Sequence, residues 1–114
     1  MNLTPSVVVL CGSTRFKTHF EQANRALTLN GRIVLAPGVF GHADGIEPTD
    51  QEKTLLDALH LRKIDLADEV LVVNPGGYIG DSTRNEIAYA QRAGKPISYL
   101  HDAQADAARS TSRG

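Results

Sequence analysis

The sequence predicts an α/β domain built on a parallel sheet of about four strands, in the order 2-1-3-4. Short apolar runs rich in Val, Ile and Leu alternate along the chain with longer segments of helical periodicity. This alternation is typical of right-handed βαβ crossovers, which place successive strands in parallel. In the expected order the first strand lies between the second and the third. A ligand site is therefore expected beside it, at the carboxyl ends of the strands.

The first half of the chain supplies two strands and a helix. Residues 6–11 form a continuous β-branched run that ends at Gly12, as a buried parallel strand does. The next helix should end at Asn30-Gly31, and its apolar stripe consists of Phe16, Phe20, Ala23 and Leu27. Residues 32–36 are the second strand. The Gly- and Pro-rich segment 37–48 is long for a loop and suggests a functional lid.

The second half repeats the pattern. Thr49 and Glu52 fit a capping box that opens the second helix, whose inner side should hold Leu56, Leu59, Ile64 and Ala67. The third strand is expected at residues 69–73, the third helix at 82–93 and a short fourth strand at 97–100. Residues 1–101 should thus form one domain, and the small, polar residues 102–114 a disordered C-terminal tail.

Composition and charge exclude several classes of function. The 12 basic and 13 acidic side chains give a net charge of -1, without the basic excess that non-specific binding to nucleic acid or to an anionic membrane requires. Cys11 is the only cysteine, so no intrachain disulfide and no cysteine-based zinc site is expected. We expect a cytoplasmic protein without a signal peptide or a membrane span.

The first candidate site follows the first strand. A glycine lets the backbone approach a ligand, while hydroxyls, helix N-terminal amides and an arginine can bind an anion. The segment matches neither a Walker A loop nor GxGxxG. The alternative is an ordinary tight turn, but its position at the expected ligand site favours binding. The candidate residues are Cys11, Gly12, Ser13, Thr14 and Arg15.

The second candidate is the Gly-rich loop that starts at Asn74, together with the beginning of the next helix. A carboxylate here can act as nucleophile or base toward a bound sugar. The alternative is a capping box in which Glu86 only supports the helix start at Thr83. Spacing leaves both interpretations open. The candidates are Asn74, Tyr78, Gly80, Asp81, Ser82 and Glu86.

The third candidate is His60, which falls on the inner stripe of the second helix, four residues from both Leu56 and Ile64. A histidine near the ligand can hydrogen-bond a base or transfer a proton. A partly buried structural histidine is the alternative. His19, His42 and His101 show no metal-ligand spacing.

Three segments together resemble the nucleoside 2-deoxyribosyltransferase-like superfamily, which includes deoxyribosyltransferases and nucleotide N-glycosidases. They are CGSTRF, LHLRKIDLADEVLVV and GYIGDSTRNEIAYAQRAGKPI, within residues 6–100. The resemblance implies a flavodoxin-like, three-layer fold and a homo-oligomer whose subunits share sites. It also implies that Glu86 attacks the anomeric carbon of deoxyribose, that residues 12–15 hold a 5'-phosphate, and that Ser82 lies near a phosphate or sugar contact.

The chain departs from the family at one position. The family usually has an aspartate in the second helix that handles the departing base, and His60 occupies that place here. Asp57 lies about one turn earlier in the helix.

The leading hypothesis is therefore an enzyme that cleaves the N-glycosidic bond of a nucleoside 5'-monophosphate or a related nucleotide. Glu86 is the expected nucleophile, with Tyr78 or Asp81 orienting it or the sugar, and His60 acts on the base. Phosphate contacts come from Arg15, Ser13 and Thr14. No metal or other cofactor is expected, and the expected partners are a small nucleotide and a second copy of the chain. A non-catalytic nucleotide sensor and a small protein-interaction domain are the alternatives.

Overall fold

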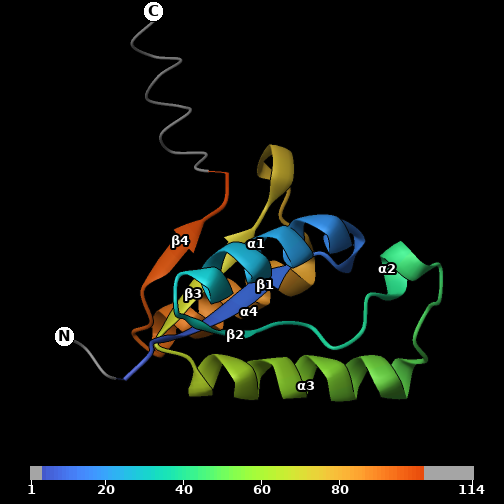
Figure 1. Cartoon of the computed structure of the whole chain (residues 1–114). Coiled ribbons are helices and arrows are strands. Elements are labelled where there is room, and N and C mark those ends of the chain that lie inside the picture. The colour runs from blue at the N-terminus through green and yellow to red at the C-terminus, as the bar shows by residue number, and fades with distance from the viewer. Residues whose placement is uncertain (1–3, 102–114) are drawn as a thin grey trace, which may run out of the picture.

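Four parallel strands form the centre of the molecule, in the predicted order (Figure 1). A computed structural model describes residues 4–101, and the tail predicted at 102–114 lies outside them. The order is β2-β1-β3-β4, which confirms the predicted sheet. The strands are β1 (Val7–Gly12), β2 (Ile33–Leu35), β3 (Glu69–Val73) and β4 (Ile97–Tyr99).

Helices cover both faces of the sheet, which gives the three layers of a flavodoxin-like fold (Figure 1). The long helices are α1 (Lys17–Leu29), α3 (Asp50–Leu66) and α4 (Asp81–Arg92). Shorter elements are α2 (Gly41–Asp44) and the 3-10 segments η1 (Thr14–Phe16) and η2 (Pro75–Gly77). No helix within residues 4–101 is long and apolar enough to cross a membrane.

The alternation of side chains along β1 decides which helices meet which residues. Val8 and Leu10 point to the face covered by α1, where they pack with Phe20. Val9 and Cys11 point to the opposite face and pack with residues of α3 and α4. The last strand residue before the turn with a side chain on that face is therefore Cys11, and it lies between two helices.

The predicted helix signals were mostly correct. The Thr49 side chain accepts from the Glu52 backbone while the Glu52 carboxylate accepts from the Thr49 N–H, so the capping box is complete. Leu59 was placed wrongly, because 47% of it is exposed. The helix turns by about 100° per residue, so the stripe that buries His60 and Ile64 leaves Leu59 on the flank.

The predicted lid segment 37–48 is partly helical, which the sequence did not indicate. It contains α2, whose end at Gly45 adopts a left-handed conformation with φ of 70°. Two side-chain contacts join it to the turn after β1 and to the first residue of α1. Thr14 Oγ1 lies 2.8 Å from His42 Nδ1, and Lys17 pairs with Asp44 at 3.0 Å.

Candidate active site

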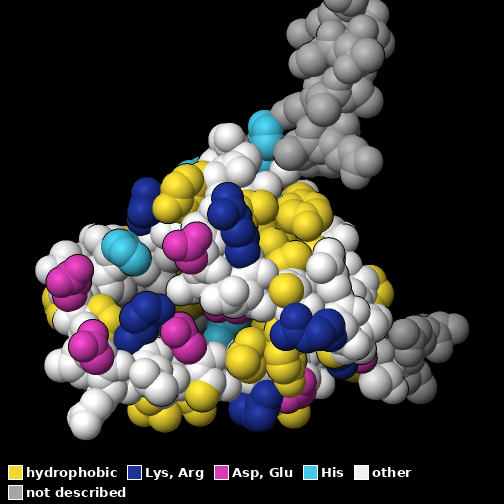
Figure 2. Space-filling model, turned by 180° about the vertical axis from the view of Figure 1, so that it is seen from behind, with side chains coloured by type: hydrophobic (Ala, Val, Ile, Leu, Met, Phe, Trp, Pro, Cys, Tyr) yellow, Lys and Arg dark blue, Asp and Glu magenta, His cyan; other side chains and the backbone are white. Residues whose placement is uncertain are grey.

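A cavity of about 590 Å³ opens beyond the carboxyl ends of β1 and β3, where the ligand site was predicted. Figure 2 shows a hollow on this face, with acidic and basic side chains around it. The turn after β1, the lid segment, the first turns of α3 and the start of α4 all contribute. Of the predicted site residues, the following line it: Gly12, Ser13, Thr14, Arg15, His60, Tyr78, Gly80, Asp81, Ser82 and Glu86.

Contacts with its neighbours hold Arg15 in place at one end of the cavity. Its Nε donates to Ser13 Oγ at 3.1 Å, and its guanidinium lies over the Tyr78 ring at 4.5 Å from the centroid. Ser13 also caps η1 by accepting from the Arg15 backbone. Because η1 is a single short turn, an anion here would meet these side chains rather than a strong helix dipole.

Three lysine or arginine side chains line the described part of the cavity. Of these, Arg15 is the one with no hydrogen bond or ion pair to a carboxylate or carbonyl oxygen. Lys53 pairs with Asp57 at 3.0 Å and donates to Ser82 Oγ at 3.2 Å. Lys63 donates to the Ala36 carbonyl at 2.7 Å. An anionic ligand therefore meets its strongest attraction at Arg15.

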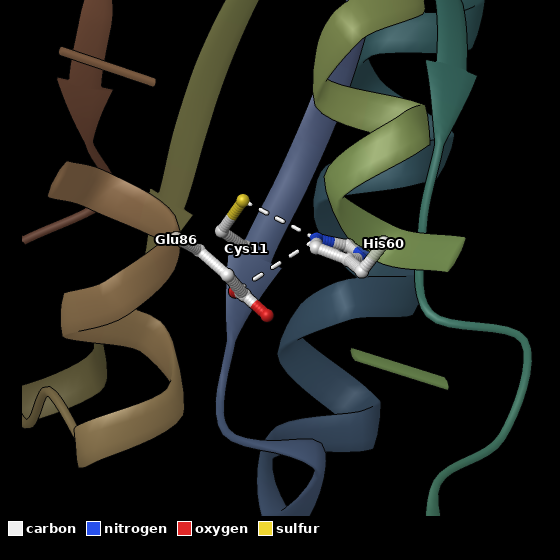
Figure 3. A group of neighbouring side chains, drawn as sticks. All are labelled: Cys11, His60 and Glu86. Carbon is white, nitrogen blue, oxygen red and sulfur yellow. Dashed lines mark hydrogen bonds and ion pairs between the residues drawn. The ribbon is translucent and has the colours of Figure 1, made fainter. Parts of the chain in front are cut away.

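At the other end of the cavity, three side chains from three elements converge (Figure 3). Cys11 lies at the end of β1, while His60 comes from α3 and Glu86 from α4. Cys11 Sγ lies 3.3 Å from His60 Nε2, and His60 Nε2 lies 3.8 Å from Glu86 Oε1. The thiol also hydrogen-bonds the Glu86 carboxylate, so one S–H proton has two possible acceptors.

Burial changes the ionisation of this group. Desolvation, followed by the charge of Asp57, raises the pKa of Glu86 to about 7. Desolvation, followed by Lys63, lowers the pKa of His60 to about 4. Between these two values both side chains are neutral, so their 3.8 Å contact is not an ion pair there. Glu86 then carries its carboxyl proton, and His60 carries a single ring proton.

The capping-box interpretation of Glu86 is wrong. The N-cap of α4 is Gly80, three residues before Thr83, and no side chain caps the helix. Thr83 is buried inside the first turn, and Glu86 falls one turn further on, where it faces Cys11 and His60. Glu86 therefore does not cap the start of α4.

Two predicted residues lie outside the cavity lining. Cys11 is fully buried behind His60 and Glu86, where burial strongly raises the pKa of its thiol. The Asn74 side chain is buried at the end of β3 and exchanges two hydrogen bonds with the backbone of His101. That pairing secures the chain after β4, which is a structural task.

Tyr78 and Asp81 line the cavity, but their described contacts are with other residues than Glu86. Tyr78 packs edge-on against Phe16, beneath Arg15. The Asp81 side chain is 99% exposed and lies 3.8 Å from Arg84. Among the described residues neither hydrogen-bonds Glu86, so the structure gives them no part in orienting its carboxylate.

Sequence reasoning missed several residues that the fold brings to the cavity. Lys53 and Thr83 line it, as does His42 through the lid segment. Helical spacing provided a signal for Lys53, which lies seven residues before His60 and so projects from nearly the same side of α3. His42 offered no comparable signal, because its place depends on the fold of the lid segment.

Comparison of the sequence with protein-family models and with curated proteins found no match. The site itself combines an anchored cation, Arg15, with a carboxyl group beside an imidazole.

Exchange of Glu86 for glutamine should remove a pH-dependent part of the stability. A pKa raised in the folded state stabilises the protein below the ordinary value of 4.5, and this stabilisation is lost as the pH rises through about 7. From pH 4.5 to pH 8, the free energy of unfolding of the wild type should fall relative to Glu86→Gln by up to about 3 kcal/mol. Urea titrations at several pH values measure this difference.

Asp81→Asn is the matched control, because it makes the corresponding exchange of carboxylate for amide in a side chain of α4 that is 99% exposed. His60 is present in all three proteins. Its lowered pKa reduces stability as the pH falls from 6.5 toward 4, and this effect largely cancels in the comparison. If the difference in free energy of unfolding between the wild type and Glu86→Gln does not change with pH, burial does not raise the pKa of Glu86.

Proposed function

We propose that this protein cleaves the N-glycosidic bond of a nucleoside 5'-monophosphate or a related nucleotide, by hydrolysis or by transfer of the sugar to a second base. The observation that carries the proposal is a buried carboxyl group and an imidazole 3.8 Å apart, in a cavity that has an unpaired arginine at its other end. The resemblance of three segments to the nucleoside 2-deoxyribosyltransferase-like superfamily agrees with this arrangement.

In the proposed reaction Glu86 is the nucleophile. A carboxylate oxygen forms a bond to the anomeric carbon, and the bond from that carbon to the base nitrogen breaks with its electron pair going to the base. Water then attacks the anomeric carbon and gives a proton to His60 Nε2, while the bond from that carbon to the Glu86 oxygen breaks, which releases the sugar phosphate and restores the carboxylate. In the transfer reaction, a nitrogen of a second base takes the place of water.

The shared proton gives His60 a role in the same step. Transfer of the proton from the Glu86 carboxyl to His60 Nε2 creates a carboxylate and an imidazolium together. The first is the nucleophile, and the second is the acid that protonates the departing base. His60 thus takes over the work that an aspartate performs in the family that the sequence resembles.

Phosphate recognition is assigned to the turn after β1. Arg15 is already held by Ser13 and Tyr78, so little side-chain freedom is lost when it binds an anion. Ser13 and Thr14 add hydroxyl groups on the same side of the cavity. Such a site distinguishes a nucleotide from the corresponding nucleoside.

The two alternatives from the sequence receive less support. A protein-interaction domain would present a flat surface at the strand ends, and a cavity lies there instead. A nucleotide sensor requires no second proton-transfer group beside Glu86, yet His60 is in contact with it.

We also propose that the chain works in the cytoplasm as a homodimer or a larger homo-oligomer. The cytoplasmic location rests on the single cysteine. Self-association is supported by leucines on the outer side of α3, where Leu55 is 57% and Leu66 is 71% exposed. Leu59 lies beside this stripe and also lines the cavity, and a second copy of the chain would cover the stripe.

Glu86→Gln should reduce base release by several orders of magnitude and change nucleotide affinity little, because the amide keeps the shape and lacks the nucleophile. The assay scans nucleosides and nucleoside monophosphates for free base and, separately, for binding. Asp81→Asn is the control and should retain activity. If the wild type binds nucleotides and releases no base from any of them, the protein is a sensor.

Arg15→Ala should weaken binding of a nucleoside monophosphate far more than binding of the matching nucleoside. A charge-assisted hydrogen bond contributes roughly 1.5–3 kcal/mol, equivalent to a factor of about 10–150 in affinity. Calorimetry with both ligands measures the two effects. Equal weakening of both ligands would remove Arg15 from the phosphate site.

Light scattering should show at least a dimer at micromolar concentration. Leu55→Glu combined with Leu66→Glu should yield monomers, because charges on both sides of a buried stripe oppose association. Leu29→Glu is the control, since Leu29 is 71% exposed on α1, which covers the opposite face of the sheet. A wild type that stays monomeric and still binds nucleotide would contradict the proposal.

A further inference from the structure

Three side chains with metal-binding atoms meet at the inner end of the cavity (Figure 3). One sulfur, one imidazole nitrogen and one carboxylate oxygen, from Cys11, His60 and Glu86, all lie within 4.8 Å of one another. We propose that these three residues bind a zinc ion. The inference goes beyond the proposed function, although its consequence for catalysis rests on that function.

The spacing of the three atoms suits a tetrahedral ion. Ordinary zinc bond lengths place two ligand atoms of a tetrahedral site about 3.4–3.6 Å apart. The sulfur–nitrogen distance is 3.3 Å and the nitrogen–oxygen distance is 3.8 Å. The sulfur–oxygen distance is at most 4.8 Å, so the three atoms lie near the spacing that a tetrahedral ion requires.

The kinds of donor atom favour zinc over the common hard cations. A thiolate with an imidazole suits Zn²⁺, whereas Mg²⁺ and Ca²⁺ select oxygen ligands. Binding releases the Cys11 thiol proton, and also the Glu86 proton where that group is neutral. The two negative ligands then balance the charge of the ion in a buried place.

The surroundings of His60 support the same role. Its ring also hydrogen-bonds the backbone of Leu10. Metal-bound imidazoles generally donate their second N–H to such an acceptor, which fixes the ring. His60 and Glu86 line the cavity while Cys11 lies behind them, so the fourth coordination position would face the cavity. Three protein ligands with one open position is the arrangement of many reactive zinc sites.

This proposal replaces the expectation that a single cysteine excludes a cysteine-containing zinc site. That expectation rested on Cys11 being the only cysteine of the chain. The fold instead brings Cys11 together with His60, which lies 49 residues further along the chain, and with Glu86, which lies 75 residues further along.

Zinc bound here would switch off the proposed glycosidase. The Glu86 oxygen that attacks the sugar would be engaged with the ion, and the nitrogen of His60 that accepts the proton would be engaged as well. Neither group could then perform its step, so zinc acts as an inhibitor that competes for the nucleophile.

The binding test uses the full chain after removal of metals with a chelator, and Co²⁺ as the probe. Bound Co²⁺ should give visible bands of tetrahedral intensity and a near-ultraviolet thiolate-to-cobalt band, with a stoichiometry of one per chain. Zn²⁺ should displace it and Mg²⁺ should not. Cys11→Ser should abolish the thiolate band and weaken Zn²⁺ by more than the roughly 10–100-fold that loss of an outer partner of a ligand produces.

His60→Gln is the second variant and should also abolish tight binding, with circular dichroism confirming that both variants fold. His42→Ala is the matched control: it removes another cavity histidine and should leave Zn²⁺ affinity unchanged. Absence of the thiolate band in the wild type would overturn the proposal. Zn²⁺ affinity that survives in folded Cys11→Ser, or that disappears in His42→Ala, would overturn it too.

An activity assay provides a test that is independent of the binding measurements. Zn²⁺ should inhibit base release by the wild type, and the inhibition should be much weaker in Cys11→Ser when each rate is divided by its own metal-free rate. If no base is released under any condition, the proposed function fails while the cobalt spectrum still decides on the zinc site. If base release occurs and bound Zn²⁺ leaves it intact, inhibition is excluded and Glu86 is not the nucleophile.

Discussion

The pairing of β1 with β3 determines where every functional group of this protein lies. The register places Cys11 opposite Val72 and Gly12 opposite Val73. Gly12 lies so close to β3 that a Cβ atom there would stand 2.5 Å from the Val73 carbonyl oxygen. Because the two strands end together, the turns that follow them start from one point. The helices α3 and α4 then bring His60 and Glu86 to the last residue of β1 that faces them.

The same convergence sets the electrostatics. A carboxyl group, an imidazole and a thiol have left water together, and burial favours the neutral form of each. The protein offsets this loss of solvation locally: the thiol hydrogen-bonds its neighbours, and the His60 ring hydrogen-bonds the Leu10 backbone. Arg15, by contrast, is exposed to solvent and packs against the Tyr78 ring. Charged side chains thus line the cavity around a buried group that is neutral and shares a proton.

Local patterns were sufficient to predict the sheet order and most element bounds. The Thr49 capping box and the β-branched run at β1 depend on neighbours in sequence, and both are as predicted. Side-chain partners depend on packing and were predicted less well. The contact of Cys11 with His60 joins residues 49 apart, and the capping pattern before Glu86 was misleading because α4 begins earlier, at Gly80. Asn74 looked like a ligand contact because it follows a strand, yet its amide is used by the His101 backbone.

Glu86 is the point at which the two proposed uses of the site exclude each other. As a nucleophile it needs a carboxylate that is unshielded and close to a proton acceptor, and His60 at 3.8 Å provides that acceptor. As a metal ligand it needs the same lone pair and the same neighbour. Burial serves both uses, because a poorly solvated carboxylate is reactive toward carbon and binds a cation strongly. What separates them is Cys11, which the glycosidase reaction does not require and a zinc ion does. Val9, on the same face of β1, has an ordinary hydrocarbon side chain. The thiol of Cys11 is therefore explained by the zinc site and not by the glycosidase reaction.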